Sequence, residues 1–227
     1  MFTQCEDFRG LFEDIKRLDE ETGRNYIVDG KPLPSVTSVI SFINKDKFIK
    51  WRQKVGDQVA DLKSRKAAAR GTKLHRVLEE YLMNGDYKSL EEFKTPLIQL
   101  MFGSAKGQLD SRLNNIYHQE TKMSSHRIGV AGTVDLICEV DGELSIVDFK
   151  TSAKEKPEEW LEDYFVQLSA YWAMFSERTG MVPKKLVVFL VGENGDVQIV
   201  ERRNIMNYLM ILQDYVSKFI RHRDANT

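Results

Sequence analysis

The sequence has few cysteines and no long apolar segment. Cys5 and Cys138 are the two cysteines among 227 residues, too few for a disulfide framework, a zinc knuckle or a four-cysteine iron–sulfur cluster. No apolar run approaches the roughly 18 residues that a membrane-spanning helix needs. The stretch from Met1 to Glu21 lacks the basic, apolar or Arg/Ser-rich composition of a targeting segment. These absences argue against a secreted or membrane protein and favour the reducing cytoplasm.

The charges are balanced over the whole chain but not along it. The net charge of −1 argues against a protein that is coated with nucleic acid. Between Lys45 and Lys73, however, ten Lys or Arg residues stand against three Asp residues, a local surplus of seven positive charges. Such a stretch indicates either a phosphate-binding surface or a solvated helix face. Charge alone leaves both interpretations open.

The apolar periodicity changes near residue 117, where helix-like patterns give way to strand-like patterns. The fold expected is a single α/β domain over 1–227, with a mainly helical, DNA-contacting part (1–116) and a catalytic part (117–227). The catalytic part should be a central mixed β-sheet of about five strands flanked by helices. The expected helices are 5–22, a short one capped by Thr37, 46–55, 57–83, 89–116, 158–179 and 204–221, with a hairpin at Asp29-Gly30. The expected strands are 117–123, 130–140, 143–150, 185–191 and 196–201.

The most informative segment is 132–150, which contains a tight hairpin. Asp141-Gly142 is a strong signal for a two-residue turn. With these residues as the loop, Val140 faces Glu143, and the register carried back sets Asp135 opposite Asp148. Side chains directly opposite each other lie about 4.5–5.5 Å apart at Cβ. The hairpin therefore predicts two carboxylates side by side.

The surroundings of this acidic pair favour a metal site. Both strands are apolar on both faces, which predicts that helices cover the sheet on either side. Two buried acids need a cation or a shared proton, and Mg²⁺ or Mn²⁺ with oxygen ligands meets that need. Lys150, two residues after Asp148, projects from the same strand face. The alternative is that Asp135 and Asp148 are solvated strand ends and that Lys150 is their salt-bridge partner.

Candidate partners of this pair lie in the expected helices. His75 shares a helix face with Glu79, and a nitrogen ligand beside two carboxylates suits Mn²⁺ or Mg²⁺, although a lone helical histidine is often structural. In the 158–179 helix, Gln167 is the residue that packing explains least, and Tyr171 follows it by one turn. Trp51, among basic residues, is either a stacking surface for unpaired bases or a buried side chain.

Four motifs in order resemble those of a known nuclease family. Gly71-x-x-x-His75, Gly132-x-x-Asp135, Asp148-x-Lys150 and Gln167-x-x-x-Tyr171 look like the RecB-like branch of the PD-(D/E)XK nucleases, whose fold is restriction-endonuclease-like. The preceding segment, from Leu33 to His75, is similar to the group that contains the mitochondrial genome maintenance exonuclease and its bacteriophage and bacterial relatives. The resemblance runs from about residue 26 to residue 200. Each motif alone is weak, and their order makes the match specific.

The resemblance implies a role for each matching residue. The metal ligands would be His75, Asp135, Asp148 and the backbone carbonyl of Phe149. Lys150 would orient or activate the attacking water, Gln167 and Tyr171 would support the site, and Glu120 would be an additional acid. Val134 precedes Asp135 where the family name has proline, which is usual in this branch. The sub-branch with iron–sulfur clusters is excluded because it needs four cysteines.

The function expected is metal-dependent hydrolysis of DNA, with a preference for single strands with free ends. One competing interpretation is a structure-specific or restriction-type endonuclease, and the other is a non-catalytic DNA-binding module of a recombination complex. The partners expected are DNA and proteins of replication or recombination, in the cytoplasm of a bacterial cell or a phage-infected host, with no membrane involved. The DNA-contacting residues expected are Lys47, Lys50, Trp51, Arg52, Lys54, Arg70 and Lys73.

Overall fold

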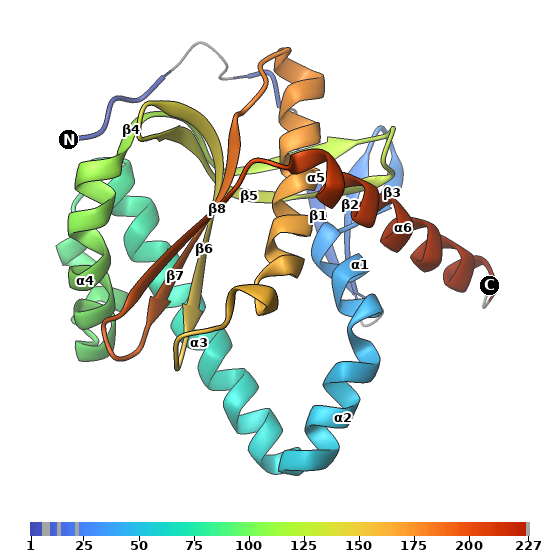
Figure 1. Cartoon of the computed structure of the whole chain (residues 1–227), viewed down its shortest axis with the longest axis horizontal. Coiled ribbons are helices and arrows are strands. Elements are labelled where there is room, and N and C mark those ends of the chain that lie inside the picture. Colours follow the sequence, from blue (N-terminus) through green and yellow to red (C-terminus); the bar gives the residue numbers. More distant parts are fainter. Residues whose placement is uncertain (6–9, 13–14, 21–22, 226–227) are drawn as a thin grey trace.

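A five-stranded mixed sheet forms the centre of the protein (Figure 1). The computed structural model describes residues 1–5, 10–12, 15–20 and 23–225. The β6–β7 pair is parallel, and the other three neighbouring pairs are antiparallel. The predicted mixed sheet of about five strands is confirmed. The strands, in their spatial order, are β4 (Leu113–Ser125), β5 (Val130–Val140), β6 (Glu143–Ser152), β7 (Lys185–Gly192) and β8 (Val197–Arg202).

Helices cover both faces of the sheet, as the apolar strands predicted. Alternate residues of β5 divide between two apolar layers: Leu136 and Cys138 lie in one layer, and Ile137 lies in the other. All residues of β7 are buried, as in a strand covered on both sides. The first layer is completed by α3 (Asp57–Leu82) and α4 (Pro96–Arg112), and the second by α1 (Val36–Ile43), α5 (Glu162–Thr179) and α6 (Ile205–Asp224).

The helix expected over 5–22 is wrong for the part that the structure describes. Residues 16–20 form β1 (Lys16–Glu20), which pairs in antiparallel fashion with β2 (Gly23–Val28), and β2 pairs with β3 (Lys31–Pro34). Residues 6–9, 13–14 and 21–22 lie outside the described residues. The predicted Asp29-Gly30 hairpin is confirmed, with φ values of 48° and 73°. The hairpin supplies an edge with which residues 16–20 form hydrogen bonds, and this tertiary pairing overrides their helical pattern.

Two expected helix boundaries are also wrong. The N-cap of α1 is Ser35 rather than Thr37, because the Ser35 hydroxyl accepts the Ser38 amide at 2.9 Å. The helix expected over 89–116 is shorter, since residues 113–116 belong to β4, where Leu113 and Ile116 pair with β5. Helix α3, by contrast, continues through Gly71 without a break. The remaining short elements are the 3₁₀ turns η1 (Tyr87–Ser89), η2 (Glu92–Lys94) and η3 (Glu158–Trp160).

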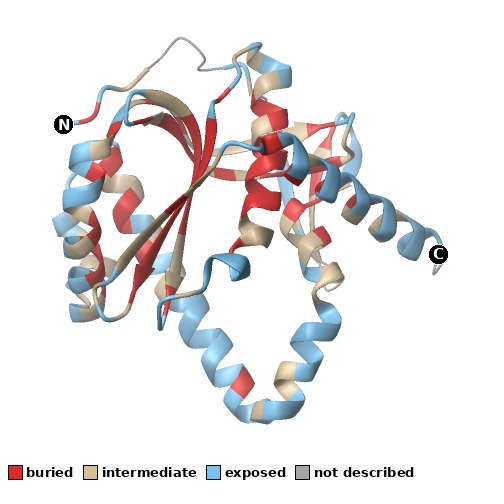
Figure 2. Cartoon of the chain, viewed as in Figure 1, coloured by how far each residue is buried: buried red, intermediate tan, exposed pale blue. Residues whose placement is uncertain are grey.

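Helix α2 (Lys45–Val55) and the first part of α3 form a helical arch over residues 45–73, which stands away from the sheet (Figures 1 and 2). Within it, Ala60 is the one buried residue. Gly56 joins the two helices with φ 83° and ψ 147°, a conformation that is almost restricted to glycine. Apolar side chains such as Phe48 and Leu62 are exposed on the arch. The basic stretch therefore lies on a solvated projection rather than on the body.

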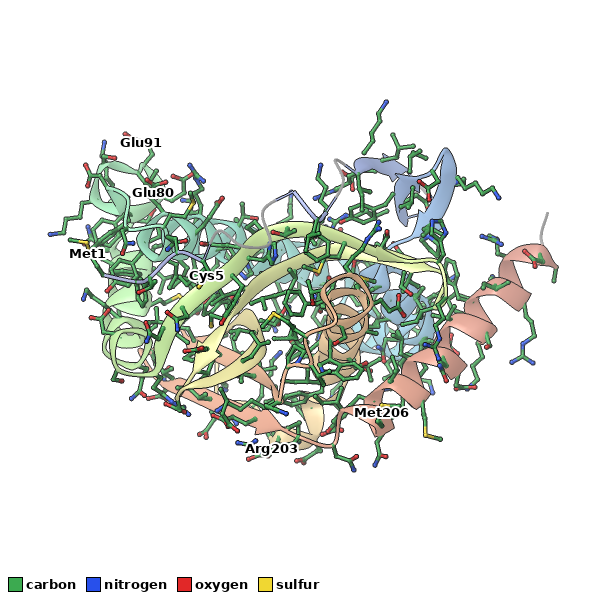
Figure 3. All side chains as sticks on the ribbon, turned by 90° about the horizontal axis from the view of Figure 1, so that it is seen from above. Met1, Cys5, Glu80, Glu91, Arg203 and Met206 are labelled. Atoms are coloured by element: carbon green, nitrogen blue, oxygen red, sulfur yellow. The ribbon has the colours of Figure 1, made fainter. Side chains whose placement is uncertain are left out.

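The C-terminal helix α6 extends from the body on the side away from Glu80 and Glu91 (Figure 3). Its buried residues, including Tyr208 and Leu212, pack into the layer formed with α5. None of the described helices has the length and apolar content needed to cross a bilayer. Cys138 is buried in β5 as a free thiol, where it acts as a small apolar core residue.

His118 makes the stability of the fold depend on pH. Its ring is 8% exposed in β4, its edges meet Phe12 and Phe175, and its Nε2 has no hydrogen-bond partner among the described residues. Burial lowers the pKa of His118 to about 4. An unfolded histidine has a pKa of about 6.5. The unfolded chain therefore binds the extra proton between these values, and the contribution of neutral His118 to stability is lost as the pH falls from about 6.5 towards 4.

When the pH falls from 7 to 4.5, we expect the free energy of unfolding to decrease by about 2 kcal/mol less in His118→Phe than in the wild type, because the phenyl ring takes no proton. Urea denaturation of both proteins at the two pH values measures this difference. His126→Gln is the control, since His126 is exposed and pairs with Asp29 at the surface. Equal losses for the wild type and His118→Phe would contradict the assignment.

Candidate active site

The β5–β6 hairpin positions the two predicted acids. Asp141 and Gly142 have φ values of 52° and 78°, as a two-residue primed turn requires. The observed pairs Val140–Glu143, Cys138–Ser145 and Leu136–Val147 match the predicted register. The regular pairs end there, one step before Asp135 and Asp148. In place of a direct carboxylate pair, the Phe149 amide donates to Asp135 Oδ2 at 2.9 Å.

Asp135 lies in a cluster with an imidazole and a second acid. Single ligand atoms of His75, Glu120 and Asp135 all lie within 4.8 Å of one another. His75 Nδ1 is 3.7 Å from Asp135 Oδ2 and 3.9 Å from Glu120 Oε1. On the other side of the ring, Nε2 is 2.7 Å from the Phe149 carbonyl oxygen. Helix α3 thus places the His75 imidazole between the acids of β4 and β5 on its Nδ1 side and the Phe149 carbonyl of β6 on its Nε2 side.

Glu120 reaches this cluster through an unusual backbone conformation. Its neighbours Gln119 and Thr121 pair with Leu136 and Val134, so Glu120 stands opposite Asp135 across the β4–β5 ladder. Its φ of 46° is in the left-handed region, which costs a non-glycine residue of order 1 kcal/mol or more. A strained residue whose carboxylate contributes to an acidic cluster is a candidate functional residue.

The acids stabilise the charged form of His75. Burial alone would lower its pKa, but the Asp135 charge, the interaction of the ring N–H with the Glu120 carboxylate and the Asp148 charge together raise the pKa to about 9. In the absence of a metal, the imidazolium is therefore the counter-ion of the cluster. A site that holds a proton among several carboxylates is one that a divalent cation can occupy instead.

Asp148 is fully buried, which rules out its interpretation as a solvated strand end. The Lys150 ammonium lies 2.6 Å from its Oδ1 and 2.5 Å from its Oδ2. Gln167 Nε2 approaches Oδ1 at 3.4 Å and is 3.3 Å from the Tyr171 hydroxyl. Burial, together with the nearby Asp135 charge, raises the pKa of Asp148 to about 6 against the opposing effect of Lys150. For Lys150, burial acts to lower the pKa, but Asp148 and Asp135 outweigh it and raise the pKa above its usual value.

Tyr171 explains the glycine of the Gly132-x-x-Asp135 spacing. A Cβ atom on Gly132 would lie 2.7 Å from the Tyr171 ring and 2.8 Å from its hydroxyl, closer than real contacts allow. Because Tyr171 and Gln167 lie one turn apart on α5, the absence of a side chain at Gly132 lets both residues approach β5 and β6. Gly71, in contrast, has room for a Cβ atom, since its nearest neighbour there would be Thr151 Oγ1 at 3.8 Å.

Two residues near Lys150 were not identified from the sequence. The Lys150 ammonium lies 5.1 Å from the centre of the Tyr164 ring, and Lys156 Nζ lies at the same distance from that ring. Lys156 also donates to the Tyr164 hydroxyl at 2.8 Å. Spacing could have indicated Tyr164, because it precedes Gln167 by three residues and Tyr171 by seven and so shares their face of α5.

The residues of the site fit a divalent cation. Neighbouring ligands of one octahedral ion lie about 3 Å apart, the separation that ligand distances of 2.0–2.1 Å at right angles give. His75 Nδ1 lies 3.7 Å from Asp135 Oδ2 and 3.9 Å from Glu120 Oε1, between this separation and the roughly 4 Å of opposite ligands. Asp135 and Glu120 add carboxylate oxygens, the ligands that Mg²⁺ and Mn²⁺ prefer. The three-residue cluster does not include Asp148, whose nearest charged group is Lys150.

The predicted DNA-contacting lysines lie on exposed surfaces. Lys47, Lys50 and Lys54 are exposed on α2, and their spacing of three and four residues places them on one helix face. Lys73 is exposed on α3, where its ammonium lies 3.3 Å from Thr95 Oγ1. Among the residues that the structure describes, none forms an ion pair with the three lysines of α2. These three lysines therefore form one face of the arch that is open to a polyanion.

The other three predicted contacts are engaged within the protein. Arg52 forms ion pairs with Asp57 and Asp61 across the tip of the arch. Arg70, 9% exposed at its side chain, pairs with Glu193 in the β7–β8 connection. Trp51 is half-buried, and its ring lies 5.5 Å from that of Phe48. These contacts give Arg52 and Arg70 a structural role in holding the arch.

Comparisons with known proteins give one family and two similar solved structures. Two solved structures are similar: a "Putative exonuclease" from Eubacterium rectale (12% identity, 70% of this chain and 69% of the other, TM-score 0.48) and the protein SSO0001 (14% identity, 79% and 74%, TM-score 0.38). A search of curated proteins found no significant match. The family model described as "PD-(D/E)XK nuclease superfamily" matches residues 49–222, most of the chain and all of the site. The chain therefore belongs to the PD-(D/E)XK nuclease superfamily.

Proposed function

We propose that this protein is a metal-dependent DNA exonuclease that hydrolyses phosphodiester bonds, with a preference for single strands with free ends. The observation that carries the proposal is the buried Asp148–Lys150 pair beside the cluster of His75, Glu120 and Asp135. The four ordered motifs support the RecB-like branch and kinship with the mitochondrial genome maintenance exonuclease and its phage and bacterial relatives. DNA is the proposed substrate, and proteins of replication or recombination are the proposed partners.

The residues that would hold Mg²⁺ or Mn²⁺ are His75, Glu120, Asp135 and Asp148, together with the Phe149 carbonyl. Bound there, the cation would polarise a phosphate oxygen and lower the pKa of a coordinated water. Lys150 supplies an ammonium within the same buried space, where a positive charge stabilises a phosphate in the transition state more strongly than it would in water. The Gln167 side-chain amide donates to Asp148 and also to the Tyr171 hydroxyl, so that it links these two residues.

The helical arch is the proposed DNA-binding surface. Lys47, Lys50 and Lys54 present three positive charges on one face of α2, and Phe48 and Trp51 offer aromatic rings next to them. Cations interleaved with aromatic side chains bind single strands through the phosphates and the faces of the bases. Helix α3 connects this surface directly to His75, so that a strand held by the arch is presented to the cluster.

We expect Lys150→Met to abolish nucleotide release from end-labelled single-stranded DNA in Mg²⁺, with a loss of at least about 10²-fold, because an electrostatic contact to the reacting phosphate is removed. DNA affinity should stay close to that of the wild type, whereas thermal stability should fall because buried Asp148 loses its compensating cation; circular dichroism at the assay temperature verifies that the variant is folded. The matched control is Lys154→Met, which removes an exposed lysine four residues away. Undiminished cleavage by Lys150→Met would contradict the role of the amine. Circular single-stranded DNA tests end dependence, since an exonuclease leaves it intact and an endonuclease cuts it.

We expect Mn²⁺ to bind more tightly as the pH rises, by up to about tenfold per pH unit below pH 9, because His75 must lose its proton to become a ligand. Titration calorimetry in two buffers of different ionisation enthalpy measures both the affinity and the protons released. In His75→Gln, the amide coordinates without losing a proton, so binding should weaken and its pH dependence should flatten. A pH-independent affinity in the wild type would exclude His75 as a ligand.

We expect the variant Lys47→Ala/Lys50→Ala/Lys54→Ala to bind single-stranded DNA more weakly and with a salt dependence whose slope falls by about 2, because three phosphate contacts are lost. Fluorescence anisotropy with a labelled oligonucleotide measures this slope between about 50 and 200 mM salt, the range over which affinity based on phosphate contacts falls steeply. A control variant, Lys88→Ala/Lys94→Ala/Lys184→Ala, removes the same charge outside the arch. Equal effects of the two variants would show that only net charge matters.

A further inference from the structure

The Lys150 ammonium has contacts on two sides. The carboxylate of Asp148 holds it with distances of 2.6 and 2.5 Å, and the ring of Tyr164 lies 5.1 Å away. An ammonium within about 6 Å of an aromatic ring is attracted by the ring, and more strongly where water is excluded. The Lys150 side chain is 22% exposed, so much of its surface is shielded from water. The aromatic contact therefore contributes to where the amine sits.

Tyr164 is itself held in a defined position. It lies in the first turn of α5, where its amide donates to the Leu161 carbonyl at 2.9 Å. Its half-buried ring packs against the apolar layer beneath α5. Lys156, in the connection between β6 and α5, donates from Nζ to the Tyr164 hydroxyl at 2.8 Å. A ring fixed at its base, its face and its tip can act as a rigid support for a flexible lysine.

The support by Asp148 alone would not be sufficient during the proposed reaction. A carboxylate oxygen that ligates a divalent cation attracts the ammonium less, because the cation neutralises its charge and repels Lys150. The four rotatable bonds of lysine then leave the amine free to move. The Tyr164 ring carries no such competing role. The ring would keep the Lys150 amine near the acids when a divalent cation also binds the Asp148 carboxylate.

We propose that Tyr164 is a positioning residue that fixes the Lys150 amine for catalysis through the face of its ring. This inference rests on the proposed function, in which Lys150 acts on the phosphate. It assigns the ring, rather than the hydroxyl, as the essential part of Tyr164. A different role, stacking of the ring on a substrate base, would act on DNA binding instead of on the chemical step.

The test compares kcat and KM for a single-stranded, end-labelled oligonucleotide in Mg²⁺. We expect Tyr164→Leu to lower kcat between about threefold and thirtyfold with KM little changed, the loss that one cation–ring contact accounts for. Tyr164→Phe and Tyr164→Trp keep the ring and should keep kcat within about twofold of the wild type. Tyr164→Met offers a second variant without the ring, should Leu unfold the protein. Tyr215→Leu is the matched control, because Tyr215 contacts Asp163 on α5 but is not placed against either lysine.

Each other result overturns the inference in a distinguishable way. An unchanged kcat in both Tyr164→Leu and Tyr164→Met would remove the positioning role. A rise in KM alone would assign the ring to base stacking. A loss in Tyr164→Phe, reproduced by Lys156→Met, would transfer the role to the hydroxyl–Lys156 contact. A wild-type protein that releases no nucleotides would refute the proposed function itself, whereas an active wild type with an equally active Tyr164→Leu refutes only this inference.

Discussion

The site depends on one buried charge, the carboxylate of Asp148. A carboxylate without access to water is strongly unfavourable unless a cation and hydrogen bonds compensate it. Lys150 supplies the cation, Gln167 supplies an amide, and α5 must lie close to the sheet to bring that amide within reach. The close approach of α5 in turn requires a glycine at 132, where Tyr171 occupies the space of a side chain. One electrostatic requirement thus links two strands, a helix and a glycine.

Much of the central sheet follows from the sequence because its signals are local. The Asp141-Gly142 turn sets the register of β5 and β6, and the apolar residues on both strand faces indicate two covering layers. The geometry of the site was harder to predict from the sequence, because the regular β5–β6 pairing ends one pair before Asp135 and Asp148. Glu120 reaches the cluster only through a left-handed backbone conformation, which no residue pattern indicates. The resemblance, rather than the periodicity, pointed to Glu120.

The errors lie where distant contacts decide the structure. Residues 16–20 have a pattern compatible with either element, and the neighbouring hairpin selects a strand. Arg70 belongs to a basic stretch, and its predicted DNA contact stays a prediction, but its ion pair with Glu193, more than a hundred residues away, could not be seen in the sequence. Charge runs are visible in a sequence, whereas the acids that neutralise individual members are not. The four lysines predicted as DNA contacts are exposed and form no ion pair among the described residues, whereas Arg52 and Arg70 are paired with acids.

The unbroken course of α3 restricts how such a protein can evolve. The helix spans residues 57–82, about 39 Å at 1.5 Å per residue, from the tip of the arch to a point beyond His75. Because Leu74, Val77 and Leu78 hold the His75 end in the core, each residue added or removed ahead of it would rotate the arch by about 100° relative to the acids. Insertions that adapt the projection to a different substrate are therefore tolerated only at the Gly56 end, or in whole-turn increments. The cluster of His75, Glu120 and Asp135 and the direction of the arch are therefore coupled through one continuous helix.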